Sequence, residues 1–121
     1  MDILIRNASF ETPAIELNPG IGRLEFTGRS LPEDSATFFK PVLGWIDEYL
    51  TQPAIKTDVE IKLEYFNTAT SMVLLKIFNK LNQLEGLTIH WYHYPEDEDM
   101  LESGKEFEEL SSLNFVYHEF N

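Results

Sequence analysis

Hydrophobic and polar residues along the chain alternate in two ways, with the two-residue period of a strand or the longer period of a helix. Strand-like alternation runs through 14–18 and 22–27, and the turn Asn18-Pro19-Gly20 between them predicts a hairpin. Residues 2–6 form a further candidate strand. The front of the chain is therefore predicted to be antiparallel.

Apolar residues at helical spacing then predict three helices separated by strands. The first helix is expected over about 35–51, capped by Asp34 or Ser35 and kinked or divided by Pro41. The remaining elements, in chain order, are predicted as a strand at 58–66, a helix at 68–85 ended by Gly86, a strand at 87–94, a helix at 96–112 and a strand at 114–120. Strands separated by helices indicate parallel pairing.

The parity of the strands indicates how the sheet is covered. One face of the strand at 58–66 carries charged residues, and the other is predicted to carry Val59, Ile61, Leu63 and Tyr65. The strand at 87–94 separates Leu87, Ile89 and Trp91 from Thr88, His90 and Tyr92 in the same way. We therefore predict an α/β two-layer fold, with a mixed sheet of about four to six strands and three helices mainly on one face. The open face is either solvated or a docking surface.

Composition narrows the classes of partner. The 121 residues suit a single domain over 1–121, and 43% hydrophobic with 13% aromatic residues is typical of globular chains. The 21 acidic against nine basic residues give a net charge of −12, which disfavours nucleic acid and anionic membranes. No apolar run approaches the ~20 residues that span a bilayer, so we expect no membrane insertion. The absence of cysteine and of a leader-like start favours a cytoplasmic protein.

No enzymatic or metal-binding motif stands out. His90 and His93 lie three apart on a strand and should point to opposite faces, and His118 is isolated in the sequence. Asp97 and Asp99 fit the start of a calcium loop, but the following residues do not continue it. We therefore expect a non-enzymatic protein with no cofactor and no metal.

The start of the second helix is unusually rich in hydroxyl side chains. Placed at 100° per residue, Thr68, Met72, Leu75 and Asn79 share a face away from the main apolar stripe. A phosphoryl group on Thr68 would lie where a helix N-terminus favours an anion, yet it would oppose a partner packed on Met72 and Leu75. The simpler interpretation is that the hydroxyl groups only cap the helix and that Leu75 packs on a neighbouring helix.

Four segments resemble the SiaC family of regulatory phosphoproteins in order and spacing, over Thr12 to about Phe115. They are TPAI, GRLEFTGRSLPEDSATFFKPVLGWI, LEYFNTATS and WYHYPEDEDMLESGKEFEEL. The most telling patterns are Gly28-x-Ser30-x-Pro32-Glu33-x-Ser35 and Tyr65-Phe66-Asn67-Thr68. The chain departs from the family pattern at Ala69 and Met72.

The resemblance implies a fold similar to STAS, the anti-sigma-factor-antagonist domain, and a function in partner switching. It implies phosphorylation on Thr68 by a histidine-kinase-like Ser/Thr kinase, and reversal by a PP2C-type phosphatase. Thr70 and Ser71 are alternative acceptors, although the helical period turns them toward or beside the buried face. The unmodified form would bind and activate a GGDEF-type diguanylate cyclase, raising cyclic di-GMP and promoting biofilm formation. The predicted partner-binding residues are Tyr65, Phe66, Asn67, Thr68, Met72, Leu75 and Asn79.

Two other functions are compatible with the sequence. One is an anti-sigma-factor antagonist with the same phosphorylation switch. The other is a small-ligand-binding or enzymatic domain that uses the polar sheet face. A concave pocket lined by His90, Tyr92 and Lys62 would favour it, whereas a flat or convex face would count against it.

Overall fold

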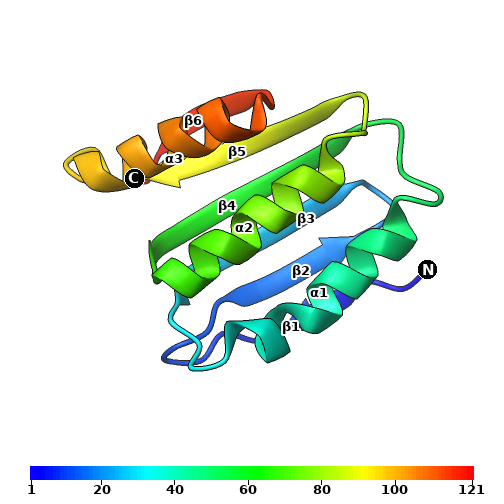
Figure 1. Ribbon diagram of the computed structural model, residues 1–121, viewed down its shortest axis with the longest axis horizontal. Helices are drawn as coiled ribbons and strands as arrows, with labels where there is room; N and C mark the ends of the chain where they lie inside the picture. Colours follow the sequence, from blue (N-terminus) through cyan, green and yellow to red (C-terminus); the bar gives the residue numbers. More distant parts are fainter.

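A computed structural model describes residues 1–121 as one six-stranded sheet with three helices on one of its faces (Figure 1). The elements in chain order are β1 Leu4–Arg6, β2 Ala14–Asn18, β3 Arg23–Ser30, α1 Ser35–Tyr49, β4 Thr57–Phe66, α2 Thr68–Leu81, β5 Leu87–His93, α3 Glu98–Ser111 and β6 Phe115–Glu119. The predicted fold class is confirmed.

The strands lie in the sheet in the same order as in the chain. β1, β2 and β3 pair antiparallel, and β3, β4, β5 and β6 pair parallel through the three helical connections. The helices bury the apolar face of the sheet, and the largest fully buried side chains are Trp91, Tyr49, Phe26, Phe39 and Phe78. The opposite face carries the polar residues that strand parity predicts, and it is not covered by a helix.

Local signals set the helix boundaries. The Asp34 carboxylate accepts a hydrogen bond from the Thr37 backbone N–H and caps α1, which then continues through Pro41 as one helix. The expected division of α1 at Pro41 is therefore wrong. α2 ends at Leu81 rather than at residue 85, and the chain turns into β5 through Gly86, whose φ of 69° favours glycine.

A bulge near the end of β4 changes which side chains face the helices and which face the open side of the sheet. Gly28 pairs with Leu63, but the next residue of β3 pairs with Tyr65, so Glu64 is an extra residue on β4. The bulge lets both Leu63 and Phe66 reach the helix-covered face, where the Phe66 ring packs edge-on against Trp91. Tyr65 is 55% exposed, so its predicted place on the apolar face is wrong.

No helix of the protein has the length and apolar character needed to cross a bilayer.

Candidate partner-binding site

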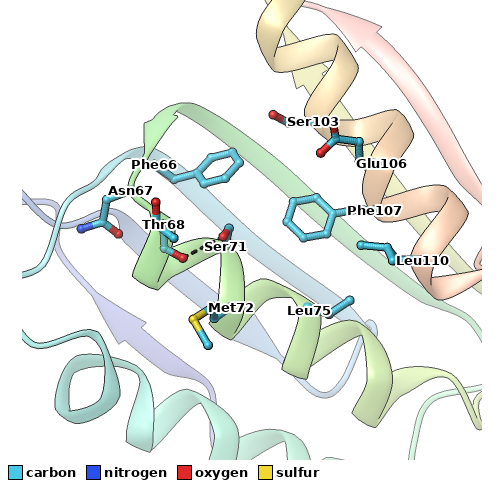
Figure 2. A pocket seen from close by; sticks show the side chains of 10 residues that line it. All are labelled: Phe66, Asn67, Thr68, Ser71, Met72, Leu75, Ser103, Glu106, Phe107 and Leu110. Atoms are coloured by element: carbon cyan, nitrogen blue, oxygen red, sulfur yellow. Dashed lines mark hydrogen bonds between the residues drawn. The ribbon is translucent and has the colours of Figure 1, made fainter.

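The four polar side chains at the start of α2 have different surroundings. Asn67 is the N-cap, because its side-chain oxygen accepts a hydrogen bond of 2.9 Å from the Thr70 backbone N–H. The Thr70 hydroxyl is fully buried, 2.8 Å from the Ser30 hydroxyl and 3.2 Å from the Ser30 carbonyl oxygen. Ser71 donates a hydrogen bond of 2.7 Å to the Thr68 carbonyl oxygen (Figure 2). These three side chains hold the helix start in place.

Thr68 differs from its neighbours. It is the first residue of α2, its side chain is exposed, and its hydroxyl makes no hydrogen bond within the protein. The strand β4 ends two residues earlier, so the hydroxyl stands at the end of the helix layer, next to the Phe66 ring (Figure 2). An enzyme could reach this oxygen without unfolding the helix.

A groove of about 340 Å³ runs beside Thr68, between α2 and α3 (Figure 2). The β4–α2 side contributes Phe66, Asn67, Thr68, Ser71, Met72 and Leu75, and α3 contributes Ser103, Glu106, Phe107 and Leu110. Met72 and Leu110, which are 69% and 67% exposed, place large apolar side chains on both walls of this groove. Such an open apolar groove is typical of a surface that another protein covers.

The groove collects most of the residues predicted to bind a partner, but not all of them. Phe66, Asn67, Thr68, Met72 and Leu75 line it. Asn79 is exposed on α2 beyond the groove, and Tyr65 lines a separate hollow of about 210 Å³ beside the start of α3.

The α3 side of the groove was not anticipated from the sequence. The spacing of Phe107 and Leu110 places them on neighbouring turns of one helix face, which could have indicated a shared stripe. Periodicity alone could not show that this stripe faces α2. Glu106 is the single charged residue in the groove, so the groove offers no cation to a phosphate group.

The open sheet face carries a second polar cluster. His90 Nε2 lies 2.8 Å from an Asp58 carboxylate oxygen, and His90 Nδ1 lies 2.9 Å from His118 Nε2. His118 is therefore not isolated, because parallel pairing of β5 and β6 aligns it with Tyr92, next to His90. His93 lies on the opposite, buried side, as predicted.

This cluster also includes charged and aromatic groups. Lys62 Nζ lies 2.8 Å from a Glu25 carboxylate oxygen and 5.1 Å from the centre of the Tyr92 ring. Burial raises the pKa of the Glu25 carboxyl, but hydrogen bonding and charge from Lys62 and Arg23 outweigh it and leave the pKa below its usual value. None of the four cavities is lined by His90, Tyr92 or Lys62, so the concave pocket that would favour a small-ligand site around these residues is missing.

Comparisons with known proteins agree on one family. Residues 6–120 match the family described as SiaC family regulatory phosphoprotein. An uncharacterized protein of Pseudomonas aeruginosa strain UCBPP-PA14 is 28% identical over 109 residues, which cover 87% of this chain and 86% of that protein.

Two solved structures are similar over almost the whole chain. One is apo-SiaC from Pseudomonas aeruginosa, with 26% identity, a TM-score of 0.82 and coverage of 98% of this chain and 99% of that one. The other is a crystal structure of the diguanylate cyclase SiaD in complex with its activator SiaC, also from Pseudomonas aeruginosa. That match has 25% identity, a TM-score of 0.89 and coverage of 97% and 99%. The family match and the shared fold together show that this chain belongs to the SiaC family of regulatory phosphoproteins.

Proposed function

We propose that this protein is a non-enzymatic partner-switching regulator whose unmodified form binds and activates a diguanylate cyclase. One observation carries the proposal: the exposed, unbonded hydroxyl of Thr68 lies at the rim of the apolar groove between α2 and α3. The kinase-accessible group and the docking surface are therefore adjacent. The similar Pseudomonas aeruginosa SiaC, which is crystallised with the cyclase that it activates, supports the choice of partner.

Phosphorylation of Thr68 would change binding without unfolding the protein. The phosphoryl group adds roughly 1.5 to 2 negative charges at the N-terminus of α2, where the free backbone N–H groups and the helix dipole favour an anion. Asn67 would still cap the helix through the Thr70 N–H. The fold should therefore tolerate the modification.

Binding of a partner in the groove should not tolerate the phosphoryl group on Thr68. A partner covering Met72 and Leu110 would have to desolvate the dianion, and Glu106 adds a like charge on the opposite wall. A cost of about 3 kcal/mol would weaken binding roughly 100-fold, which is enough to empty a micromolar complex. Thr70 is a poor acceptor because its hydroxyl is buried, and Ser71 is already bonded to the helix backbone.

The regulators in this proposal are a histidine-kinase-like Ser/Thr kinase and a PP2C-type phosphatase. Both would act on Thr68, and the kinase would draw on cytoplasmic ATP. Through the cyclase, the unmodified protein would raise cyclic di-GMP and promote biofilm formation.

Thr68→Asp and Thr68→Asn form a matched pair that tests the switch, because the two side chains differ in charge but hardly in shape. We expect Thr68→Asp to lower affinity for the candidate cyclase by at least about tenfold, since each 1.4 kcal/mol is a factor of ten. Thr68→Asn should bind like the wild type, and both should keep the wild-type melting temperature. If Thr68→Asp unfolds the domain, Thr68 is only structural and the proposal fails.

Intact-mass measurement identifies the modified residue. Incubation with the candidate kinase and ATP should add one phosphoryl group to the wild type and to Ser71→Ala, but none to Thr68→Ala. Unchanged phosphorylation of Thr68→Ala would move the switch to another residue. Co-purification of an anti-sigma factor instead of a cyclase would keep the switch and replace the client.

A further inference from the structure

The outer edge of β1 is an unpaired strand edge with apolar side chains. β1 is the terminal strand of the sheet and pairs only with β2. Leu4 of β1 packs against the core, whereas Ile5 of β1 and Ile3, which precedes the strand, are 56% and 52% exposed. The Trp45 indole N–H donates a hydrogen bond of 3.0 Å to the Asp2 carbonyl oxygen and so holds the segment against α1. An ordered, apolar edge of this kind is a template for another strand.

The sequence of this edge is complementary to itself. If two copies of Asp2-Ile3-Leu4-Ile5-Arg6 pair antiparallel about Leu4, then Asp2 of each copy lies opposite Arg6 of the other, and Ile3 lies opposite Ile5. A two-fold axis repeats both contacts, as an isologous interface requires. Opposite charges and apolar residues in directly opposed positions stabilise a strand pair.

We infer that β1 is a self-association edge and that the protein forms a two-fold dimer through antiparallel β1–β1 pairing. The net charge of −12 opposes contact between two copies in general, so an edge where positive and negative side chains match is the favoured place for it. A hollow of about 490 Å³ beside β1, lined by Leu4 and Trp45 among others, gives the second copy's Leu4 room on the helix side.

The other edge of the sheet lacks these features. β6 carries Phe-Val-Tyr-His-Glu, and antiparallel self-pairing about Tyr117 would place Glu119 opposite Phe115 with no cation to match it. These features therefore favour β1 over β6 as the self-association edge. β1 and β6 lie at opposite ends of the sheet, and α3 packs beside β5 and β6, so a β1 dimer would leave both α2–α3 grooves open (Figure 1).

Charge reversal tests this pairing in solution. Sedimentation velocity over a concentration series should show a wild-type dimer with about twice the mass of one chain. Asp2→Arg and Arg6→Asp each place like charges opposite one another, so each variant alone should be monomeric under conditions where the wild type is dimeric. The double variant Asp2→Arg/Arg6→Asp exchanges the charges and should dimerise again.

Mixing the two single variants gives the sharpest outcome. Asp2→Arg carries two cations at the edge and Arg6→Asp carries two anions, so the pair should form a heterodimer although neither variant self-associates. Glu119→Arg on β6 is the matched control and should dimerise like the wild type. A wild type that stays monomeric throughout, or a dimer that the charge reversals leave intact, would overturn the inference, and unchanged circular dichroism will show that each variant is folded.

Discussion

At the scale of single residues, neighbouring hydroxyl groups on α2 serve different purposes. Thr68 is exposed and unbonded, whereas Thr70 is fully buried and bonded to Ser30. Both residues are threonines, and they lie two positions apart in the sequence. Only their surroundings in the folded protein distinguish them. Substitutions that remove each hydroxyl should therefore act on different properties of the protein.

We expect Thr70→Val to lower the free energy of unfolding by about 1–3 kcal/mol, because it leaves the buried Ser30 hydroxyl without a partner. The Ser30 carbonyl oxygen keeps its bond from the Asn67 N–H, so the double variant Ser30→Ala/Thr70→Val should recover much of the loss. Urea denaturation measures both. Thr68→Val is the control and should stay within about 0.5 kcal/mol of the wild type. An equal loss at Thr68 would contradict the assigned roles.

At the scale of elements, one glycine sets how closely α3 approaches the sheet. A Cβ built on Gly104 would lie 2.6 Å from a carbon of the buried Trp91 ring, whereas a Cβ on Gly44 of α1 meets nothing within 4 Å. Both glycines lie inside helices, where alanine is favoured by about 0.5–1 kcal/mol. The two positions therefore separate helix propensity from close packing.

We expect Gly44→Ala to raise the free energy of unfolding by about 0.5–1 kcal/mol. Gly104→Ala should lower it by about 1–3 kcal/mol, because the Trp91 ring has no room to move and α3 must shift. Chemical denaturation of both variants checks the signs. A stabilised Gly104→Ala would show that α3 is free to move away from the sheet.

The two walls of the groove can be tested apart from stability. Leu75 is half-buried and packs against the core, so Leu75→Asp should reduce both folding stability and binding. Met72 is mostly exposed, so Met72→Asp should weaken the proposed cyclase complex by about tenfold or more while the melting temperature changes little. Ile55→Asp adds the same charge at a site that is 98% exposed beyond the other end of β4, and it should bind normally. Undiminished binding by Met72→Asp would remove the groove from the interface.

The limits of the sequence prediction also lie at the scale of elements. Period and capping residues predicted the strands, the helices and the one-sided covering of the sheet. The predicted sheet face was wrong at Tyr65, because one extra residue in β4 exchanges the two faces at the end of the strand. The α3 wall of the groove and the contact between His90 and His118 depend on how elements pack, which a local period does not contain.

At the scale of the whole molecule, tyrosines of the C-terminal half link stability to pH. Tyr92, Tyr94 and Tyr117 each donate a hydrogen bond to a carboxylate, with distances of 3.0, 2.8 and 2.6 Å. Burial followed by the Glu108 carboxylate raises the pKa of Tyr117 well above its ordinary value of 10.0, and the pKa of each of the other two is raised as well.

A raised pKa means that the folded state holds the phenol proton more tightly than the unfolded state does. The stability that this difference contributes is fully present below pH 10. It is lost as the pH rises towards the pKa of the tyrosine in the folded protein. We expect Tyr117→Phe to cost about 1 kcal/mol near neutral pH, where it leaves Glu108 without its donor. Above pH 10 the variant should lose stability less steeply than the wild type, as urea titrations at several pH values will show. A loss of stability above pH 10 that is as steep in Tyr117→Phe as in the wild type would contradict this role of the hydrogen bond between Tyr117 and Glu108.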